Sequence, residues 1–574
     1  MNRKNLTAAV LAGLAGAAGI VGTASASHDN DVFLNPDGLG QVLIYPYYTV
    51  NAGNATLMSV VNTTGSAKAV KVRFKEGENS REVLDFNLYL SEYDVWSGAV
   101  INDGGTPTLI IGDNSCTVPY LYANDSDDDG FGEQVFLDFD YTGENADGGS
   151  GGIERAMEGH MEIIEMGAMW DDPFYIDSKT RPYGSETAAT HVEDENGDQV
   201  PLDCQMLNDQ WSTLAGVDGL WLDDNSADMD ELSGGLFGSA SVVNVGQGTL
   251  FSYNARAIGD FDNEGDLHVE PGTSEPNLNS GDNWSAHVND GNGDTDTFSY
   301  GRGVDAVSAI FMHDAIMNEY SLGGIAAAQS EWVITFPTKG WYVDSAWYEV
   351  ENTFFINTNN PSDPGCAYAD DHDGDPQTPN LVGQWEVNPT GDPSLGSVNG
   401  ISGVTVPPAC DVKTGVKVTE NFPSDPFTSE FDGEACEEVS FYIWDANENA
   451  ASTPTPGDDL PIVSPPPPPG TSTPGVAFEL CYETSILQFG DSDIFGSSNT
   501  HTVNTTNESG WAKIGFDLSD EDGDINVLSA NDGGDLTGLP VTGFWAAKFT
   551  NGNVGGVLSN YGGLFDHKGS VSVD

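Results

Sequence analysis

The chain has 574 residues, of which 18 are Lys or Arg and 90 are Asp or Glu, so its formal net charge is −72 at pH 7. Such a charge repels nucleic acid and anionic lipid headgroups, which argues against both as partners. Because 38% of the residues are hydrophobic and 10% are aromatic, the composition predicts folded cores rather than a disordered chain.

The first residues have the pattern of a secretory signal peptide. Arg3 and Lys4 precede an apolar stretch, 6–21, and a small-residue cleavage site that ends at Ala26. Removal of residues 1–26 takes away both cations and leaves a mature chain of charge −74. A membrane anchor is the alternative, but the apolar stretch is short and contains glycines. No later segment has the roughly 18 apolar residues of a transmembrane helix, so we expect an exported protein of the extracellular space or cell surface, with the periplasm as the alternative.

Most apolar segments alternate with the period of a β-strand and are rich in β-branched and aromatic residues. The predicted strands lie at 41–48, 55–61, 69–74, 160–167, 239–245, 249–255 and 332–336. Gly246-Gln247-Gly248 separates two of them and predicts a hairpin. The stretch 305–320 fits either a helix or a strand. We therefore predict a mainly β protein of two or three β-sandwich-like domains, with long acidic loops and few helices.

Composition divides the mature chain into three parts. Residues 27–255 are expected to form an N-terminal β-rich domain, 256–304 an acidic Gly/Asp-rich loop region, and 305–574 a C-terminal β-rich domain. A Pro-rich run, 450–474, predicts extended polyproline II structure. It could link two domains, but strand-like segments at 437–444 and 476–488 flank it, which favours a surface loop at the end of a hairpin.

Six cysteines are present, and none belongs to a C-x-x-C pair, which argues against zinc binding and thioredoxin-like chemistry. An even number of cysteines in an exported chain favours disulfide bonds. Six cysteines allow 15 connectivities. We prefer the pairs that are neighbours in sequence: Cys116 with Cys204, Cys366 with Cys410, and Cys436 with Cys481.

Acidic loops recur along the chain, with oxygen-bearing side chains at alternate positions and a glycine nearby. Calcium takes six to eight oxygen ligands, and such side chains on a curled loop can converge on it, so we predict Ca²⁺ as a ligand. The longer loops contain Asp125, Asp127 and Asp129; Asp260, Asp262, Glu264 and Asp266; and Asp290, Asn292 and Asp294. The shorter loops contain Asp194, Asn196 and Asp198; Asp371, Asp373 and Asp375; and Asp520, Asp522 and Asp524.

None of these loops is an EF-hand. Counted from Asp125, the twelfth position is Phe136, where an EF-hand needs a bidentate Glu. The alternative for every loop is a solvated acidic turn on a surface adapted to a saline habitat.

Several short segments, spread over nearly the whole mature chain, are similar to segments of a known protein family. They are found at 42–48, 59–64, 71–77, 79–90, 332–339 and 559–565. In these segments the chain resembles a family of uncharacterised exported proteins of Gram-negative bacteria. The resemblance implies that the chain is exported and that its parts belong to one protein. It implies no catalytic activity, cofactor or catalytic residue.

The sequence contains neither an H-E-x-x-H motif nor a G-x-S-x-G motif. The segment Phe489-Gly490-Asp491-Ser492 resembles the nucleophile block of one esterase class, with Asp566 and His567 as partners, but such a block normally opens a domain. We therefore predict a non-catalytic, secreted or surface-associated structural or adhesive protein that is stabilised by Ca²⁺. Its expected partners are further copies of itself or envelope polysaccharide. The alternative is an extracellular hydrolase of polysaccharide or ester substrates.

Overall fold

The computed structural model describes residues 31–121, 130–176, 181–212, 219–263, 267–289, 295–344, 350–356, 411–417, 424–446, 476–505, 507–516, 526–555 and 557–573. The predicted signal peptide 1–26 and the predicted Pro-rich loop 450–474 lie outside the described residues. The described chain is mainly β, with several antiparallel sheets and few helices, which confirms the predicted fold class.

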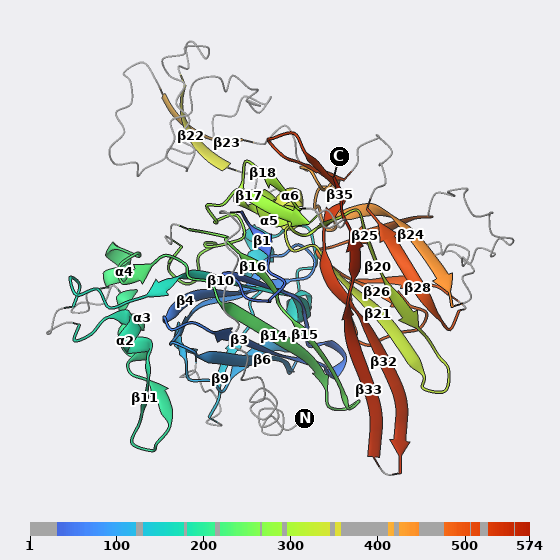
Figure 1. Ribbon diagram of the computed structural model, residues 1–574, viewed down its shortest axis with the longest axis horizontal. Helices are drawn as coiled ribbons and strands as arrows, with labels where there is room; N and C mark the ends of the chain where they lie inside the picture. Colours follow the sequence, from blue (N-terminus) through green and yellow to red (C-terminus); the bar gives the residue numbers. More distant parts are fainter. Residues whose placement is uncertain are drawn as a thin grey trace.

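The first half of the chain forms a sandwich of two sheets, drawn mainly in blue and green in Figure 1. One sheet has the order β1-β16-β2-β10-β4-β5-β8, with β13 paired to β10. Its strands are β1 (Phe33–Leu34), β16 (Arg256–Gly259), β2 (Val42–Thr49), β10 (Glu158–Met169), β4 (Lys68–Glu76), β5 (Glu82–Leu90), β8 (Cys116–Val118) and β13 (Met229–Asp230). The facing sheet contains, in order, β15 (Thr249–Asn254), β14 (Leu236–Asn244), β3 (Ala55–Asn62), β6 (Val95–Asp103), β7 (Thr106–Ile111) and β9 (Gly132–Val135).

Strand β4 shows how the sequence builds this sandwich. Its apolar residues pack between the two sheets, and the basic residues that alternate with them take the opposite face. That face is covered by the segment 267–280 rather than by water. Arg73 Nη1 donates to the carbonyl of Pro276 at 2.9 Å, and Lys71 Nζ donates to that of Glu270 at 3.3 Å. Both faces of the sheet are therefore buried.

The second half forms another sandwich, drawn mainly in orange and red on the right of Figure 1. Its outer sheet contains, in order, β25 (Val476–Cys481), β24 (Cys436–Asp445), β28 (Ser509–Gly515), β20 (Ala315–Ser321) and β34 (Lys568–Ser570). Its inner sheet contains, in order, β27 (Thr500–Val503), β26 (Thr484–Phe489), β21 (Ala328–Thr335), β32 (Thr542–Val554) and β33 (Val557–Asp566). All seven predicted strand segments overlap observed strands.

The inner sheet joins the two sandwiches. Trp332 and Trp545 on one of its faces pack into the core of the second sandwich. Val333 and Phe544, which are adjacent to these tryptophans in the two strands, belong to the core of the first sandwich, which also contains Phe251. Figure 1 shows β14 and β15 beside β32 and β33, and β15 contacts β33. The described chain is therefore built as successive layers around connected cores.

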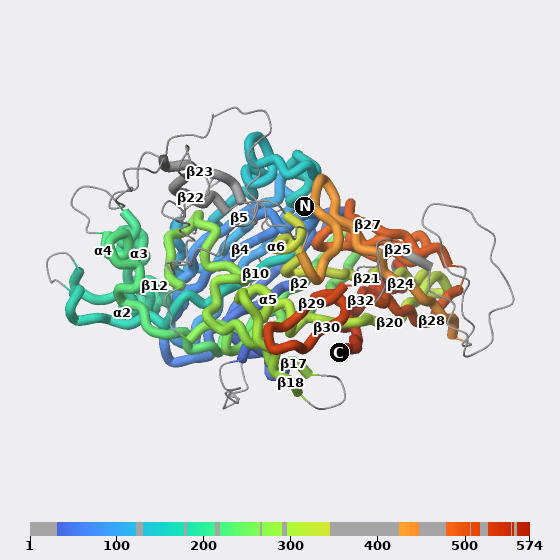
Figure 2. Tube along the Cα trace, turned by 90° about the horizontal axis from the view of Figure 1, so that it is seen from above, coloured from blue at the N-terminus to red at the C-terminus, as the bar shows by residue number. Residues whose placement is uncertain are grey.

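Short elements complete the fold. The helices are η1 (Asn51–Gly53), η3 (Phe139–Tyr141), η4 (Gly143–Asn145), η5 (Ile153–Met157), α2 (Ser185–Ala189), α3 (Cys204–Gln210), α4 (Leu220–Asp223), α5 (Gly303–Ala309) and α6 (Gly340–Val343). The small sheets contain β11 (His191–Glu193) with β12 (Gln199–Pro201); β17 (Ser285–Asn289) with β18 (Thr295–Ser299); β19 (Met312–His313) with β31 (Leu539–Pro540); β22 (Val350–Ile356) with β23 (Asp411–Lys417); and β29 (Val527–Ser529), β30 (Asp535–Thr537) and β35 (Ser572–Val573). Seen from above, β17, β18, β29 and β30 gather near the C-terminus (Figure 2).

Two segments differ from expectation or resolve an ambiguity. The region 256–304, expected to be loop, contains β16, β17 and β18. Strand β16 pairs with β2 of the first sandwich, and β17 pairs with β18. The ambiguous stretch 305–320 divides between α5 and β20.

Disulfide bonds join Cys116 to Cys204 and Cys436 to Cys481, two of the three predicted pairs. The second bond closes the β24–β25 hairpin, in which these two cysteines are register partners. The third predicted pair, Cys366 with Cys410, lies outside the described residues. Within the described ranges, no helix is long and apolar enough to span a membrane.

Candidate functional site

The few basic residues of this acidic protein are mostly in its interior. Among the described side chains, eight Lys and Arg residues are buried: Lys68, Lys71, Arg73, Lys75, Arg155, Arg181, Lys339 and Lys548. The described basic side chains that reach solvent are Arg81, Arg256, Arg302, Lys513 and Lys568. The outer surface is therefore even more acidic than the composition suggests, and the positions of the accessible cations are informative.

An open cleft of about 1080 Å³ lies between the edges of the two sandwiches. It is bounded by β15 and β16 of the first sandwich, by β20, β28 and β34 of the outer sheet of the second, and by β32 and β33 of the inner sheet. The segment 34–38 closes part of its rim. Residues distant in sequence therefore meet here because β15 of the first sandwich lies against β33 of the inner sheet.

Aromatic side chains line this cleft. Trp511 is 40% exposed and Phe565 is 51% exposed, although both lie on regular strands. The rings of Phe565 and Trp545 are 5.0 Å apart between centroids. Trp511 stacks on Trp444 with a centroid distance of 4.1 Å and an interplanar angle of 12°. Each exposed ring is thus supported by a second ring, which fixes its orientation.

Strand register orders the side chains beside these rings. Trp444, Trp511 and Glu319 form one cross-strand row over β24, β28 and β20. The next row on the same face contains Tyr442, Lys513, Met317 and Lys568. The site therefore combines aromatic faces with charged groups on a rigid sheet.

Polar contacts hold the wall of the cleft in place. Arg256 Nη2 lies 3.2 Å from Asp566 Oδ1, and both side chains remain partly exposed. Asn318 Nδ2 donates to the carbonyls of Phe565 and Asp566 at 3.0 and 3.2 Å. These bonds tie β20 to the edge of β33, so the cleft is preformed rather than dependent on a ligand for its shape.

His567 is partly buried in this wall, and its hydrogen bonds define a neutral ring. Nε2 donates to the carbonyl of Val333 at 2.9 Å, and Nδ1 accepts from Asn318 Nδ2 at 3.2 Å. Burial, together with the positive charges of Arg256 and Lys568, lowers the pKa of His567 to about 3. The ring is a positioning element of the wall and carries no charge near neutral pH.

The low pKa of His567 predicts a sensitivity to acid. The unfolded chain binds a proton at this ring below pH 6.5, whereas the folded chain does so only near pH 3, so its contribution to stability is lost as the pH falls between these values. We expect wild type to lose up to about 3 kcal/mol more than His567→Gln between pH 7 and pH 4. Denaturant titrations at each pH measure this difference. Parallel pH profiles for the two proteins would contradict it.

The predicted esterase residues are not joined in the structure. The Ser492 hydroxyl donates to the carbonyl of Phe489 at 2.7 Å and accepts from the backbone amide of Ser330 at 2.9 Å. His567 makes the bonds described above, with Val333 and Asn318. Because the hydroxyl proton of Ser492 is directed at a backbone carbonyl, this pair does not have the arrangement of an activated nucleophile and its base.

One predicted calcium loop is a closed hairpin turn between β11 and β12. Asp194 Oδ1 accepts the backbone amides of Asn196 and Asp198 at 2.8 and 2.9 Å, and Gly197 has φ +87°. These bonds lower the pKa of Asp194. The acidic side chain of Asp194 therefore stabilises the turn by itself, and calcium binding by this loop stays a prediction.

A second predicted loop is partly described. Asp262 is buried, and its Oδ2 accepts the backbone amide of Asp282 at 3.1 Å. Asp260 accepts at its carbonyl from Asn283 Nδ2 at 2.6 Å. The other predicted ligands lie outside the described residues: Glu264, Asp266, Asp125, Asp127, Asp129, Asp290, Asn292, Asp294, Asp371, Asp373, Asp375, Asp520, Asp522 and Asp524.

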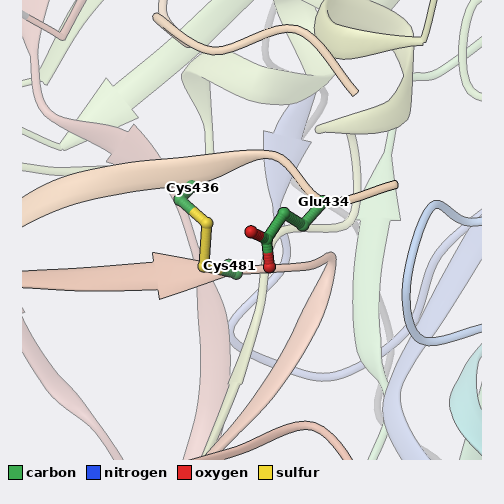
Figure 3. A group of neighbouring side chains, drawn as sticks. All are labelled: Glu434, Cys436 and Cys481. Carbon is green, nitrogen blue, oxygen red and sulfur yellow. A yellow bond between two sulfur atoms is a disulfide. The ribbon is translucent and has the colours of Figure 1, made fainter. Parts of the chain in front are cut away.

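In the described part of the chain, one group of three His, Cys, Asp or Glu residues has its ligand atoms within 4.8 Å of one another: Glu434, Cys436 and Cys481. Figure 3 shows the Glu434 carboxylate beside the bond between the two sulfurs. Metal coordination by cysteine requires the thiolate, and these sulfurs are bonded to each other. The group is a disulfide with an acidic neighbour rather than a metal centre.

The fold and the cleft together define a mainly β protein of two connected sandwiches with an open, aromatic-lined groove between them. Comparisons with protein-family models, with curated proteins and with solved structures find no match.

Sequence reasoning named Asp566 only as a possible esterase partner and missed the other residues of this cleft, which come from positions as distant as 34 and 568. A local signal exists in β28, where Trp511 and Lys513 alternate with Ala512 and Ile514 of the core. An aromatic residue on the polar side of a strand indicates a binding face. The pattern does not reveal which other strands face it.

Proposed function

We propose that this is an exported, non-catalytic adhesive protein of the cell exterior that binds polysaccharide in the cleft between its two sandwiches. The observation that carries the proposal is the exposure of Trp511 and Phe565 in a preformed groove. The proposal extends the expectation of a structural or adhesive role by giving it a binding site.

The chemistry of the groove fits a sugar chain. The C–H-rich face of a pyranose ring carries a slight positive potential and packs on the negative face of an aromatic ring. Hydroxyl groups then need hydrogen-bond partners at the edge, and Asn318, Glu319 and Asn254 line the same groove. Because the groove is open, an internal stretch of a polymer can bind in it, and no chain end has to be threaded through.

Export is supported by the N-terminal signal pattern, by the resemblance to exported proteins, and by the two disulfide bonds, which persist in oxidising compartments. The proposal includes calcium binding by the acidic loops that lie outside the described residues. Cations there would lower the self-repulsion of the chain and stabilise the fold.

The test is to replace Trp511 with alanine and to measure binding to a panel of polysaccharides by affinity electrophoresis. We expect binding to weaken by about 30-fold, because a supported, exposed Trp is a typical dominant contact of an interface. Trp284→Ala is the matched control, since Trp284 is 51% exposed and lies outside the cleft lining. Equal binding by wild type and Trp511→Ala would refute the site.

The hydrolase alternative is tested with the same proteins. Glu319 and Asp566 both line the cleft, and glycoside hydrolysis uses a pair of carboxylates. Release of reducing ends by wild type, abolished in Glu319→Gln, would replace the non-catalytic proposal with this alternative. We expect no release from any polysaccharide that binds.

A further inference from the structure

The accessible cations of the described chain gather at the proposed cleft, and this distribution specifies the ligand. Arg256 and Lys568 line the cleft, and Lys513 lies just outside the lining on β28, two residues from Trp511. The other two, Arg81 and Arg302, lie elsewhere and are neutralised by Asp344 at 2.7 Å and by Asp305 at 2.6 Å. This inference rests on the proposed function and narrows it to one class of polysaccharide.

Lys513 and Lys568 flank Met317 on the outer face of the sheet. They are its register partners in β28 and β34, so their Cα atoms are separated by two strand spacings, about 10 Å. Within the described chain, neither lysine has a carboxylate within ion-pair distance. In a protein with 90 acidic residues, two accessible lysines without such partners are unusual.

The acidic groups of the cleft do not cancel these charges. Asp566 is paired with Arg256, which leaves Glu319 as the other carboxylate of the lining. In the lining, Arg256 and Lys568 balance Asp566 and Glu319, and Lys513 adds a third cation beside it on β28, whereas the whole chain has a fivefold excess of acidic residues. At physiological ionic strength the Debye length is about 8 Å, so a ligand in contact with the cleft experiences mainly these nearby groups.

We propose that the ligand is an anionic polysaccharide whose carboxylate or sulfate groups bind Lys513 and Lys568 while its sugar rings stack on Trp511. The two contributions have different roles. Stacking accepts any pyranose of suitable shape, whereas the lysines select chains that carry negative groups beside the stacked ring.

The experiment compares polymers that share a backbone and differ in charge. Polygalacturonate is compared with its methyl ester for carboxylates, and dextran sulfate is compared with dextran for sulfates. Binding is measured in about 0.15 M NaCl with a chelator present, so that bridging by divalent cations does not contribute. The proteins are wild type, the double variant Lys513→Gln/Lys568→Gln, Trp511→Ala, and Arg302→Gln as an accessible cation outside the cleft.

We expect wild type to bind at least one anionic polymer about tenfold more tightly than its neutral counterpart, and the double variant to lose this preference. Trp511→Ala is expected to weaken binding of both members of a pair, and Arg302→Gln to change neither. Which pair responds distinguishes carboxylate from sulfate. Equal binding of charged and neutral polymers, unchanged in the double variant, would overturn the anionic ligand and leave the cleft as a general polysaccharide site. Absence of binding to every polymer would overturn both proposals.

Discussion

Replacement of Arg155 by methionine is expected to lower the free energy of unfolding by about 3–5 kcal/mol. Arg155 lies in η5 and is 4% exposed. Its guanidinium bonds Glu76 at 2.7 and 2.9 Å and Asp147 at 2.8 and 2.7 Å. Removal of the cation leaves two buried carboxylates without their principal partner. Equilibrium denaturation with guanidinium chloride measures the loss.

The effect is expected to spread through Glu76, which also organises the connection between β4 and β5. Its carboxylate accepts the backbone amides of Glu78, Asn79 and Arg81 at 2.6, 3.0 and 2.8 Å. A double replacement of Glu76 by Gln and Asp147 by Asn in the Arg155→Met background should restore part of the stability, because it removes the stranded charges.

Arg256→Met is the matched control for this prediction. The Arg256 and Asp566 side chains are 33% and 56% exposed, and an ion pair of this kind contributes about 0–1 kcal/mol. A loss of similar size in both variants would show that the buried network contributes no more than a surface pair.

The strands of this protein were predictable because their signal is local. In 239–245 and 249–255, alternation of apolar and polar residues and the intervening Gly246-Gln247-Gly248 are sufficient to indicate the β14–β15 hairpin. The same holds for the hairpin of β24 and β25, whose ends are joined by Cys436 and Cys481. These hairpins are determined by residues close together in the chain, so a single sequence is sufficient to predict them.

Charge and burial were less predictable. Lys71, Arg73 and Lys75 alternate with apolar residues and have the pattern of a solvated strand face, yet all three are buried. The burial of Lys71 and Arg73 depends on the segment 267–280, about two hundred residues away, whose carbonyls accept from both side chains, whereas Lys75 pairs with Glu162. The cleft could not be predicted for the same reason, since it exists only where β16, β28 and β33 meet.

The burial of basic residues has a consequence for stability in salt. Because the interior holds eight of the described cations, few remain to offset acidic groups on the surface. Unfolding releases the buried cations to the solvent and lets the carboxylates separate, so low salt favours the unfolded chain. We expect the melting temperature to fall steadily as NaCl is reduced from about 1 M, where the Debye length is about 3 Å, to about 0.01 M, where it is about 30 Å.

Calcium should stabilise the protein beyond this general screening. In about 0.5 M NaCl, where long-range repulsion is already damped, saturating Ca²⁺ should still raise the melting temperature, and Mg²⁺ should do less because it keeps its waters. A site filled at a hundredfold excess over its Kd contributes about 2.7 kcal/mol. Asp127→Asn/Asp129→Asn should reduce this increment, whereas Asp194→Asn should not, since the Asp194 carboxylate already accepts two backbone amides of its own turn. If Ca²⁺, Mg²⁺ and NaCl of equal ionic strength stabilise the protein equally, the acidic loops are a salt-adapted surface and contain no calcium sites.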